Sequence, residues 1–231
     1  MVDWVPAVGD RLPAVEIEIR GLEHLQQALA QGKGAILWES NGFSRRVQAK
    51  RTLYTRGIPL HQTHGETHLG VMLSPPGEGT WLRDRLMKPT YERRESAFVA
   101  ETLIIPLHSG MADGRVYAKR LRENAILCMA GDGRIARKLY PVAFLGQSVE
   151  FAPGAVKLAR LVGAPLLPMF WAPSFDGPPA LDIAPPINPA AGDGDAVLVD
   201  CLQRFADALA ARVMRWPEAY RNWHLVAGEE Q

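Results

Sequence analysis

The residues best suited to acid–base chemistry lie close together between His61 and His68. Three histidines fall within these eight residues, and Glu66 lies among them. An imidazole beside a carboxylate can take a proton from a weakly acidic alcohol, so His64 with Glu66 is the candidate acid–base pair. His61 is a weaker candidate, because it is nearer the body of a predicted strand. Two alternative roles stay open for the histidines: they bind a metal ion, or they are ordinary loop residues.

A second group of polar residues follows two apolar runs of the chain. Ser40 and Asn41 come after a short run, and Asp132 and Gly133 come after a later one, Ala125–Met129. Polar loops after the strands of an open α/β sheet are where ligands bind. Ser40 could therefore be a nucleophile or a hydrogen-bond donor, and Asp132 could orient a substrate group. The alternatives are a helix N-cap for Ser40 and a loop cap for Asp132.

Three further features could hold an anionic group. Arg45 and Arg46 open a basic run that extends to Arg56, and Arg134 follows the Gly-Asp-Gly loop. Gly154 opens a predicted helix, whose free N–H groups could face an anion or an acyl oxyanion. Suitable anions are phosphate, an acidic carrier protein and a lipid headgroup. A solvated helix face and a tight turn are the alternatives for the basic run and for Gly154.

The elements that must position these residues alternate along the chain. Short apolar strands are predicted near 15–19, 35–38, 58–61, 102–106, 125–129 and 165–170, and helices near 22–30, 43–56, 80–88, 111–123, 155–162 and 195–215. This order predicts an α/β fold with a mainly parallel sheet flanked by helices. The length of 231 residues fits a single domain. Within it, 1–31 is predicted as a lead-in and 172–195, with its six prolines, as an irregular excursion.

Composition narrows the class of protein further. Lys and Arg total 26 against 25 Asp and Glu, so net charge gives no reason to expect nucleic acid as a partner. No stretch reaches the ~18 uninterrupted apolar residues of a membrane span. Cys128 and Cys201 have neither metal-binding nor redox spacing. We therefore expect a cytoplasmic protein without a bound metal, and peripheral contact with the inner membrane stays open.

Several short motifs follow one another along the chain. They are Gly32-Lys33-Gly34-Ala35-Ile36-Leu37, Leu121-Arg122-Glu123-Asn124, Gly131-Asp132-Gly133, Phe144-Leu145-Gly146, Pro153-Gly154-Ala155, Gly163-Ala164-Pro165 and Trp216-Pro217-Glu218-Ala219-Tyr220. Their order resembles the bacterial lipid A biosynthesis (lauroyl/myristoyl) acyltransferases, within the lysophospholipid acyltransferase superfamily. The resemblance implies a glycerolipid acyltransferase-like fold. It also implies an acyl donor, CoA or acyl carrier protein, that is a substrate rather than a cofactor.

The catalytic motif departs from that family. The family pattern is a His followed four residues later by Asp or Glu, and the aligned positions here are Asn41 and Arg46, or Ser40 and Arg45 after a one-residue slip. Neither register supplies a base, because Asn takes no proton at neutral pH and Arg reverses the supporting charge. Two hypotheses follow. The first is an acyltransferase with a displaced base, His64, that acylates a hydroxyl or an amine. The second is an inactive homologue that binds lipid or a partner.

Overall fold

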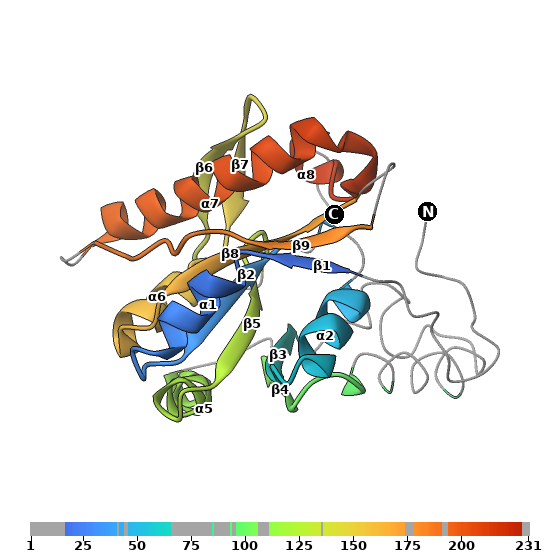
Figure 1. Cartoon of the computed structure of the whole chain (residues 1–231). Helices are drawn as coiled ribbons and strands as arrows, with labels where there is room; N and C mark the ends of the chain where they lie inside the picture. The colour runs from blue at the N-terminus through green and yellow to red at the C-terminus, as the bar shows by residue number, and fades with distance from the viewer. Residues whose placement is uncertain are drawn as a thin grey trace.

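The computed structural model describes residues 17–40, 42–43, 46–65, 85, 93, 96–105, 111–134, 136–173, 178–190 and 194–227. Within these ranges, seven strands form one sheet in the order β1-β9-β8-β2-β5-β3-β4, with helices packed around it (Figure 1). The strands of this sheet are β1 (Glu18–Arg20), β2 (Ala35–Glu39), β3 (Leu60–Gly65), β4 (Glu101–Ile105), β5 (Ile126–Ala130), β8 (Leu166–Ala172) and β9 (Ala180–Ile183).

The direction of the strands confirms the predicted fold class. Strands β8, β2, β5, β3 and β4 all pair in parallel. Strand β9 is antiparallel to β8, and β1 pairs in parallel with β9. Every residue of β2 and of β8 is buried, as expected where helices cover both faces of a parallel sheet. The protein therefore has an α/β fold with a mainly parallel sheet.

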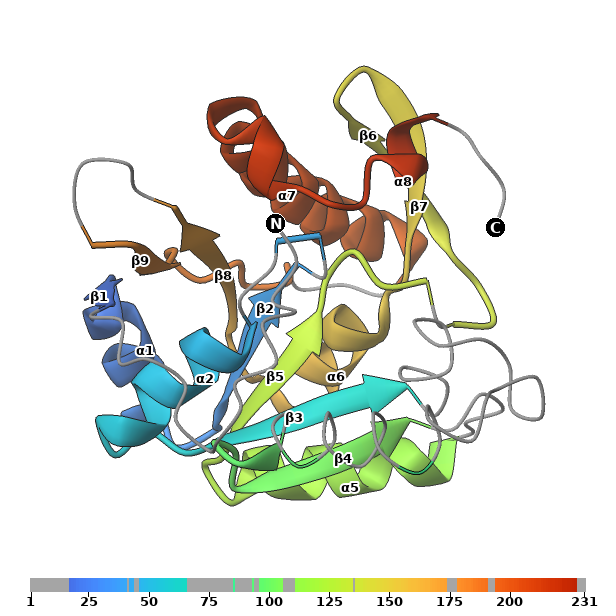
Figure 2. The same cartoon turned by 90° about the vertical axis from the view of Figure 1, so that its right-hand side faces the viewer.

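The helices divide between the two faces of this sheet. They are α1 (Leu22–Leu29), α2 (Arg46–Thr55), α5 (Met111–Arg122), α6 (Gly154–Val162), α7 (Asp195–Arg215), the 3₁₀ helix η2 (Pro217–Ala219) and α8 (His224–Ala227). Helix α2 carries the chain from β2 to β3, whereas α5 and α6 carry it back across the sheet. Because such crossovers are right-handed, α2 lies on the face opposite α5 and α6 (Figure 2).

Helix α7 packs over the centre of the sheet on the α6 side. The ring of Phe205 in α7 stacks on Trp38 of β2, with centroids 4.4 Å apart, and on Phe170 of β8 at 5.7 Å. Leu202, Leu209 and Phe205 on this helix are fully buried. The apolar stripe of this helix is therefore part of the core. No helix within the described ranges has both the length and the apolar composition needed to span a membrane.

The chain leaves β2 and β5 in opposite directions, although the two strands are neighbours. After β2 it crosses to β3, and after β5 it returns to β8 on the far side of β2. In an open α/β sheet, such a switch point separates the loops that follow the two strands and opens a crevice at their carboxyl ends. The fold alone thus marks the residues directly after β2 and β5 as the place for a ligand.

Two segments differ from the expectations. The range 172–195, predicted to be irregular, contains β9, whose four residues are all buried between β8 and β1. Prolines on both sides of this short strand hid it in the sequence. The second segment is a hairpin that was not predicted, β6 (Tyr140–Phe144) with β7 (Gln147–Phe151). Its turn residues Leu145 and Gly146 have φ of 51° and 81°, which is typical of a tight type I′ turn.

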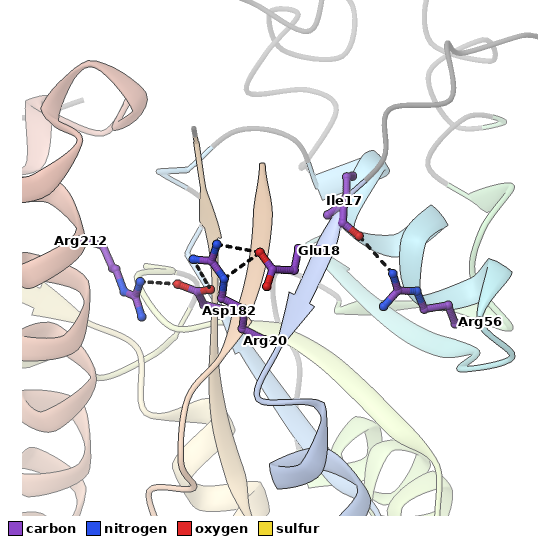
Figure 3. A network of polar contacts seen from close by, with 6 residues as sticks. All are labelled: Ile17, Glu18, Arg20, Arg56, Asp182 and Arg212. Carbon is purple, nitrogen blue, oxygen red and sulfur yellow. Dashed lines mark hydrogen bonds and ion pairs between the residues drawn. The ribbon is translucent and has the colours of Figure 1, made fainter. Parts of the chain in front are cut away.

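A network of charged side chains joins β1 and β9 to α7 (Figure 3). Asp182 of β9 accepts a hydrogen bond from Arg212 of α7, and its other oxygen lies 3.8 Å from Arg20 of β1. Arg20 in turn donates to Glu18 at 2.7 Å. The Asp182 side chain is 11% exposed and that of Arg212 27%, so this ion pair is shielded from solvent. It ties the edge of the sheet to the long C-terminal helix.

Replacing Arg212 by Met should lower the free energy of unfolding by about 2 kcal/mol, because Asp182 loses its nearest cation while it stays largely buried. Arg204→Met is the matched control on the same helix. Arg204 lies 3.9 Å from Asp200 in an exposed pair, and its loss should cost less than about 0.5 kcal/mol. Chemical denaturation of both variants measures the difference, and equal losses would contradict a structural role for the Asp182 network.

Candidate functional site

Ser40 and Asp132 meet at the switch point between β2 and β5. Ser40 follows β2 directly, and Asp132 lies two residues beyond the end of β5. The Ser40 hydroxyl donates to Oδ2 of Asp132 at 2.6 Å. The N–H of Gly42 donates to both groups, at 3.0 Å to Ser40 Oγ and 3.1 Å to Asp132 Oδ2. Both side chains are 3% exposed, so these bonds form in a protected environment, where they are strong.

The packing below Asp132 explains why a glycine precedes it. Glu39 and Ala130 are register partners in β2 and β5, and the N–H of Gly131 donates to the carbonyl of Glu39 at 2.7 Å. A Cβ on Gly131 would lie 2.3 Å from the ring of Phe205. Glycine at this position lets the loop turn directly over the aromatic core, which brings Asp132 within reach of Ser40.

The C-terminal segment completes the site, which the sequence did not indicate. Tyr220 and Phe43 form an isolated antiparallel bridge, and the N–H of Arg221 donates to the carbonyl of Gly42 at 2.8 Å. The amide of Asn222 lies 3.4 Å from Oδ2 of Asp132. A Cβ on Gly42 would be 2.1 Å from Cε2 of Tyr220, so the phenol ring rests directly on this turn. The motif 216–220 had pointed to the segment, but to no role for it.

Tyr220 is the titratable group whose environment stands out at this site. Burial raises the pKa of the Tyr220 phenol, and the nearby Asp132 carboxylate raises it further. Its hydroxyl is buried and has no hydrogen-bond partner among the residues that the structure describes. The phenol therefore stays protonated at neutral pH, as a neutral hydrogen-bond donor beside a carboxylate.

Polar groups are also buried on the other face of the sheet, behind Ser40. Trp38 faces α7, so Glu39 faces the α2 side by strand alternation. There the Gln62 amide of β3 donates to Oε1 of Glu39 at 3.1 Å. Lys50 of α2 is 1% exposed, although it lies in the basic run for which an anion-binding surface and a solvated helix face were the two expectations. A buried lysine and a buried carboxylate each need polar partners, and both have them.

His64 lies in a strand rather than in the predicted loop, whereas His61 lies in a strand as predicted. His61 and His64 lie in β3, which extends to Gly65. A polar sequence, Leu-His-Gln-Thr-His-Gly, forms this strand, and its lack of apolar alternation explains the error. His61 Nε2 is 3.8 Å from Glu101, whose pKa is lowered chiefly by a hydrogen bond from Arg120. His61 thus belongs to an ion cluster near the start of β3, away from Ser40.

His64 lies at the same end of the sheet as Ser40. Gln62 is the register partner of Cys128 in β5, and two residues further along each strand are His64 and Ala130. Ala130 is the partner of Glu39, the residue before Ser40. The backbone of His64 is therefore level with the end of β2, with β5 between the two strands. The side chain of His64 lies outside what the structure describes.

The other predicted site residues are scattered or fall outside the described ranges. Asn41, Arg45 and Glu66 are outside them, and Arg46 opens α2 with its side chain not described. The remaining three are described. Gly133 accepts from the N–H of Ala152 at 2.9 Å, Arg134 lies 3.9 Å from Glu150 in β7, and Gly154 is the exposed first residue of α6. No group of three or more His, Cys, Asp or Glu among the described residues is placed to hold a metal ion.

Residues 94–225, more than half of the chain, match the family described as bacterial lipid A biosynthesis acyltransferase. The chain belongs to this family. The match begins after β3, so it includes Asp132, Tyr220 and Asn222 but not Ser40. Asn41 and Arg46, the positions aligned above with the family's His-x4-acid pattern, thus lie outside the matched range.

Individual relatives carry a more specific name. Phosphatidylinositol mannoside acyltransferase of Mycobacterium tuberculosis strain H37Rv is 28% identical over 225 residues, which covers 95% of this chain and 64% of the relative. The enzyme of the same name from Mycolicibacterium smegmatis is 26% identical over 227 residues, covering 94% and 65%. The chain spans less than two thirds of the length of these relatives. The crystal structure of the 1-acyl-sn-glycerophosphate acyltransferase PlsC from Thermotoga maritima matches with a TM-score of 0.33 and 13% identity, over 81% of this chain and 78% of that one.

Ser40→Ala should lower the free energy of unfolding by about 2 kcal/mol, because it removes the donor to buried Asp132 and the acceptor for the N–H of Gly42. Ser148→Ala, at an exposed position of β7, is the matched control and should change stability by less than about 0.5 kcal/mol. Urea denaturation gives both values. If Ser40→Ala behaved like Ser148→Ala, the Ser40–Asp132 hydrogen bond would have no part in fixing the turn.

Proposed function

We propose that this protein is an acyltransferase of lipid substrates, which moves an acyl group from a CoA or acyl carrier protein thioester to a hydroxyl or amine acceptor. The observation that carries the proposal is the buried polar cluster of Ser40, Asp132 and Tyr220 at the switch point of the sheet. The chain that forms this cluster belongs to an acyltransferase family. The similarity to two phosphatidylinositol mannoside acyltransferases supports a lipid acceptor.

The reaction needs a group that accepts the acceptor's proton. The acceptor oxygen or nitrogen attacks the thioester carbonyl carbon, the new C–O or C–N bond forms, and the C–S bond breaks. The proton passes from the acceptor to a base and from there to the departing thiolate. We assign the base to His64, with Glu66 orienting it. Strands β2 and β3 are about 10 Å apart across β5, so the backbone of His64 lies about that far from the end of β2.

Ser40 is better suited to position the turn than to act as a nucleophile. Its oxygen donates to Asp132 and accepts from Gly42, so both of its hydrogen-bonding functions are in use. A serine nucleophile also needs a base that takes its proton, and an ordinary carboxylate is too weak for that task. Asn41, in the same turn, would contribute an amide donor to the substrate. Arg45, Arg46 and Arg134, and the backbone N–H groups of Gly133 and Gly154, stay the candidates for binding the phosphates of the donor.

A second candidate function is a module that binds lipid or a partner without catalysis. It is favoured by one observation: at a position aligned with the family's histidine, Ser40 has a buried and fully engaged hydroxyl. Incubation with a panel of acyl-CoAs, followed by mass spectrometry of free CoA and of co-purified lipid, separates the two functions. Release of CoA with a matching acylated product eliminates the second candidate, and bound lipid without turnover eliminates the first.

His64→Ala should reduce transfer from dodecanoyl-CoA by about 100-fold or more, because the acceptor's proton then has no positioned base. The circular dichroism spectrum should not change. His24→Ala is the matched control: His24 contacts the backbone carbonyl of Ile183 at 3.0 Å and has no part in the proposed site. Activity near that of the wild type in His64→Ala would reject His64 as the base, and an equal loss in His24→Ala would point to general destabilisation.

A further inference from the structure

The hydroxyl of Tyr220 is a buried polar group that the proposed mechanism has not used. The Tyr220 side chain is 2% exposed, and among the described residues no group forms a hydrogen bond with its oxygen. A phenol buried without a partner costs free energy relative to phenylalanine of the same shape. Unsatisfied buried groups of this kind are rare in native proteins, and a role at a functional site is one reason for their presence.

Tyr220 is fixed in place at the crevice by its neighbours. Its ring lies against Gly42, where a Cβ would approach Cε2 to 2.1 Å, and it packs on Phe43 and Phe144 with centroids 5.7 and 5.9 Å away. Asp132 is close enough for its charge to act on the phenol. The hydrogen bond from the Asn222 side-chain amide to Asp132 is long, at 3.4 Å. A ligand group that enters beside Asp132 could replace this hydrogen bond.

The hydrogen-bonding capacity of the acceptor atom decides which acceptor this arrangement suits. A hydroxyl oxygen has one proton and two lone pairs. It can accept a hydrogen bond from Tyr220, give its proton to the base, and still attack the carbonyl carbon with its second lone pair. A neutral amine has a single lone pair, and a hydrogen bond from Tyr220 would occupy the electrons that it needs for attack.

The negative charge of Asp132 also favours a hydroxyl acceptor over an amine. A carboxylate nearby favours the protonated form of an amine and so raises its pKa. An ammonium group has no lone pair and cannot attack a thioester. A hydroxyl group carries no charge in either environment, so Asp132 does not inactivate it.

We infer that Tyr220 is a specificity-determining residue, whose hydroxyl donates a hydrogen bond to the acceptor atom and so selects hydroxyl over amine acceptors. This inference rests on the proposed acyl transfer. Tyr220 forms no covalent bond during the reaction and keeps its proton: the acceptor's proton goes to the base, and the thiolate leaves from the carbonyl carbon.

The test compares two acceptors of the same shape with the 231-residue chain. Dodecanoyl-CoA is the donor, and the acceptors are octyl β-glucoside and its 6-amino-6-deoxy counterpart, with both products measured by mass spectrometry. The wild type should prefer the hydroxyl acceptor. In Tyr220→Phe, kcat/KM for the hydroxyl acceptor should fall by about tenfold, as expected for the loss of one hydrogen bond, while kcat/KM for the amine stays the same or rises. The melting temperature should equal or exceed that of the wild type, because the deleted hydroxyl had no partner among the described residues.

Tyr140→Phe is the matched control. The Tyr140 hydroxyl donates to Asp195 at 2.6 Å, between β6 and α7, so this variant should lose stability and keep the wild-type preference between the acceptors. An unchanged preference in Tyr220→Phe, or an equal loss for both acceptors, would overturn the inference while the proposed function stands. Absence of transfer to either acceptor in the wild type would reject the proposed function, and the inference with it.

Discussion

The buried carboxylate of Asp132 is the group on which the geometry of the site depends. A carboxylate removed from water is costly unless hydrogen-bond donors surround it. Here the donors include the Ser40 hydroxyl, the N–H of Gly42 and the amide of Asn222. They come from the turn after β2 and from the C-terminal segment, which are far apart in sequence. The need to satisfy one anion therefore brings both segments to the end of β5.

Close packing around this carboxylate limits the residues that can stand beside it. Gly131 passes over the ring of Phe205, and Gly42 lies under the ring of Tyr220, in both cases with no room for a Cβ. The same aromatic rings link the site to the centre of the sheet, since Phe205 stacks on Trp38. A shift of α7 would therefore move the loop that carries Asp132, because both the loop and the core strand β2 pack against Phe205.

The sequence predicted those features that depend on local patterns. The buried strands β2 and β5, the loop position of Asp132, and the helix that Gly154 opens all follow from apolar runs and their breakers. Strand β3 was placed too short because its residues are polar. The burial of Lys50 was missed because both interpretations of the basic run, an anion-binding surface and a solvated helix face, leave its side chains exposed. Tyr220 and Asn222 could not be found, since their role arises from a contact with Gly42 and Asp132 across the fold. The Ser40–Asp132 hydrogen bond was not predicted either, because it joins two loops that are 92 residues apart in sequence.

In the core, buried positions hold apolar residues, as the sequence pattern predicts. At the crevice, buried positions hold polar residues instead. The core strands are apolar, and α7 buries a regular stripe, as a stable scaffold requires. At the crevice the chain instead buries a carboxylate, and beside it a phenol without a partner among the described residues. Phenylalanine at position 220 would fill the same space against Gly42 and remove an unsatisfied donor, so packing does not explain the hydroxyl. A polar ligand that needs a neutral donor next to a carboxylate does explain it, and that requirement connects Asp132 and Tyr220 in one binding site.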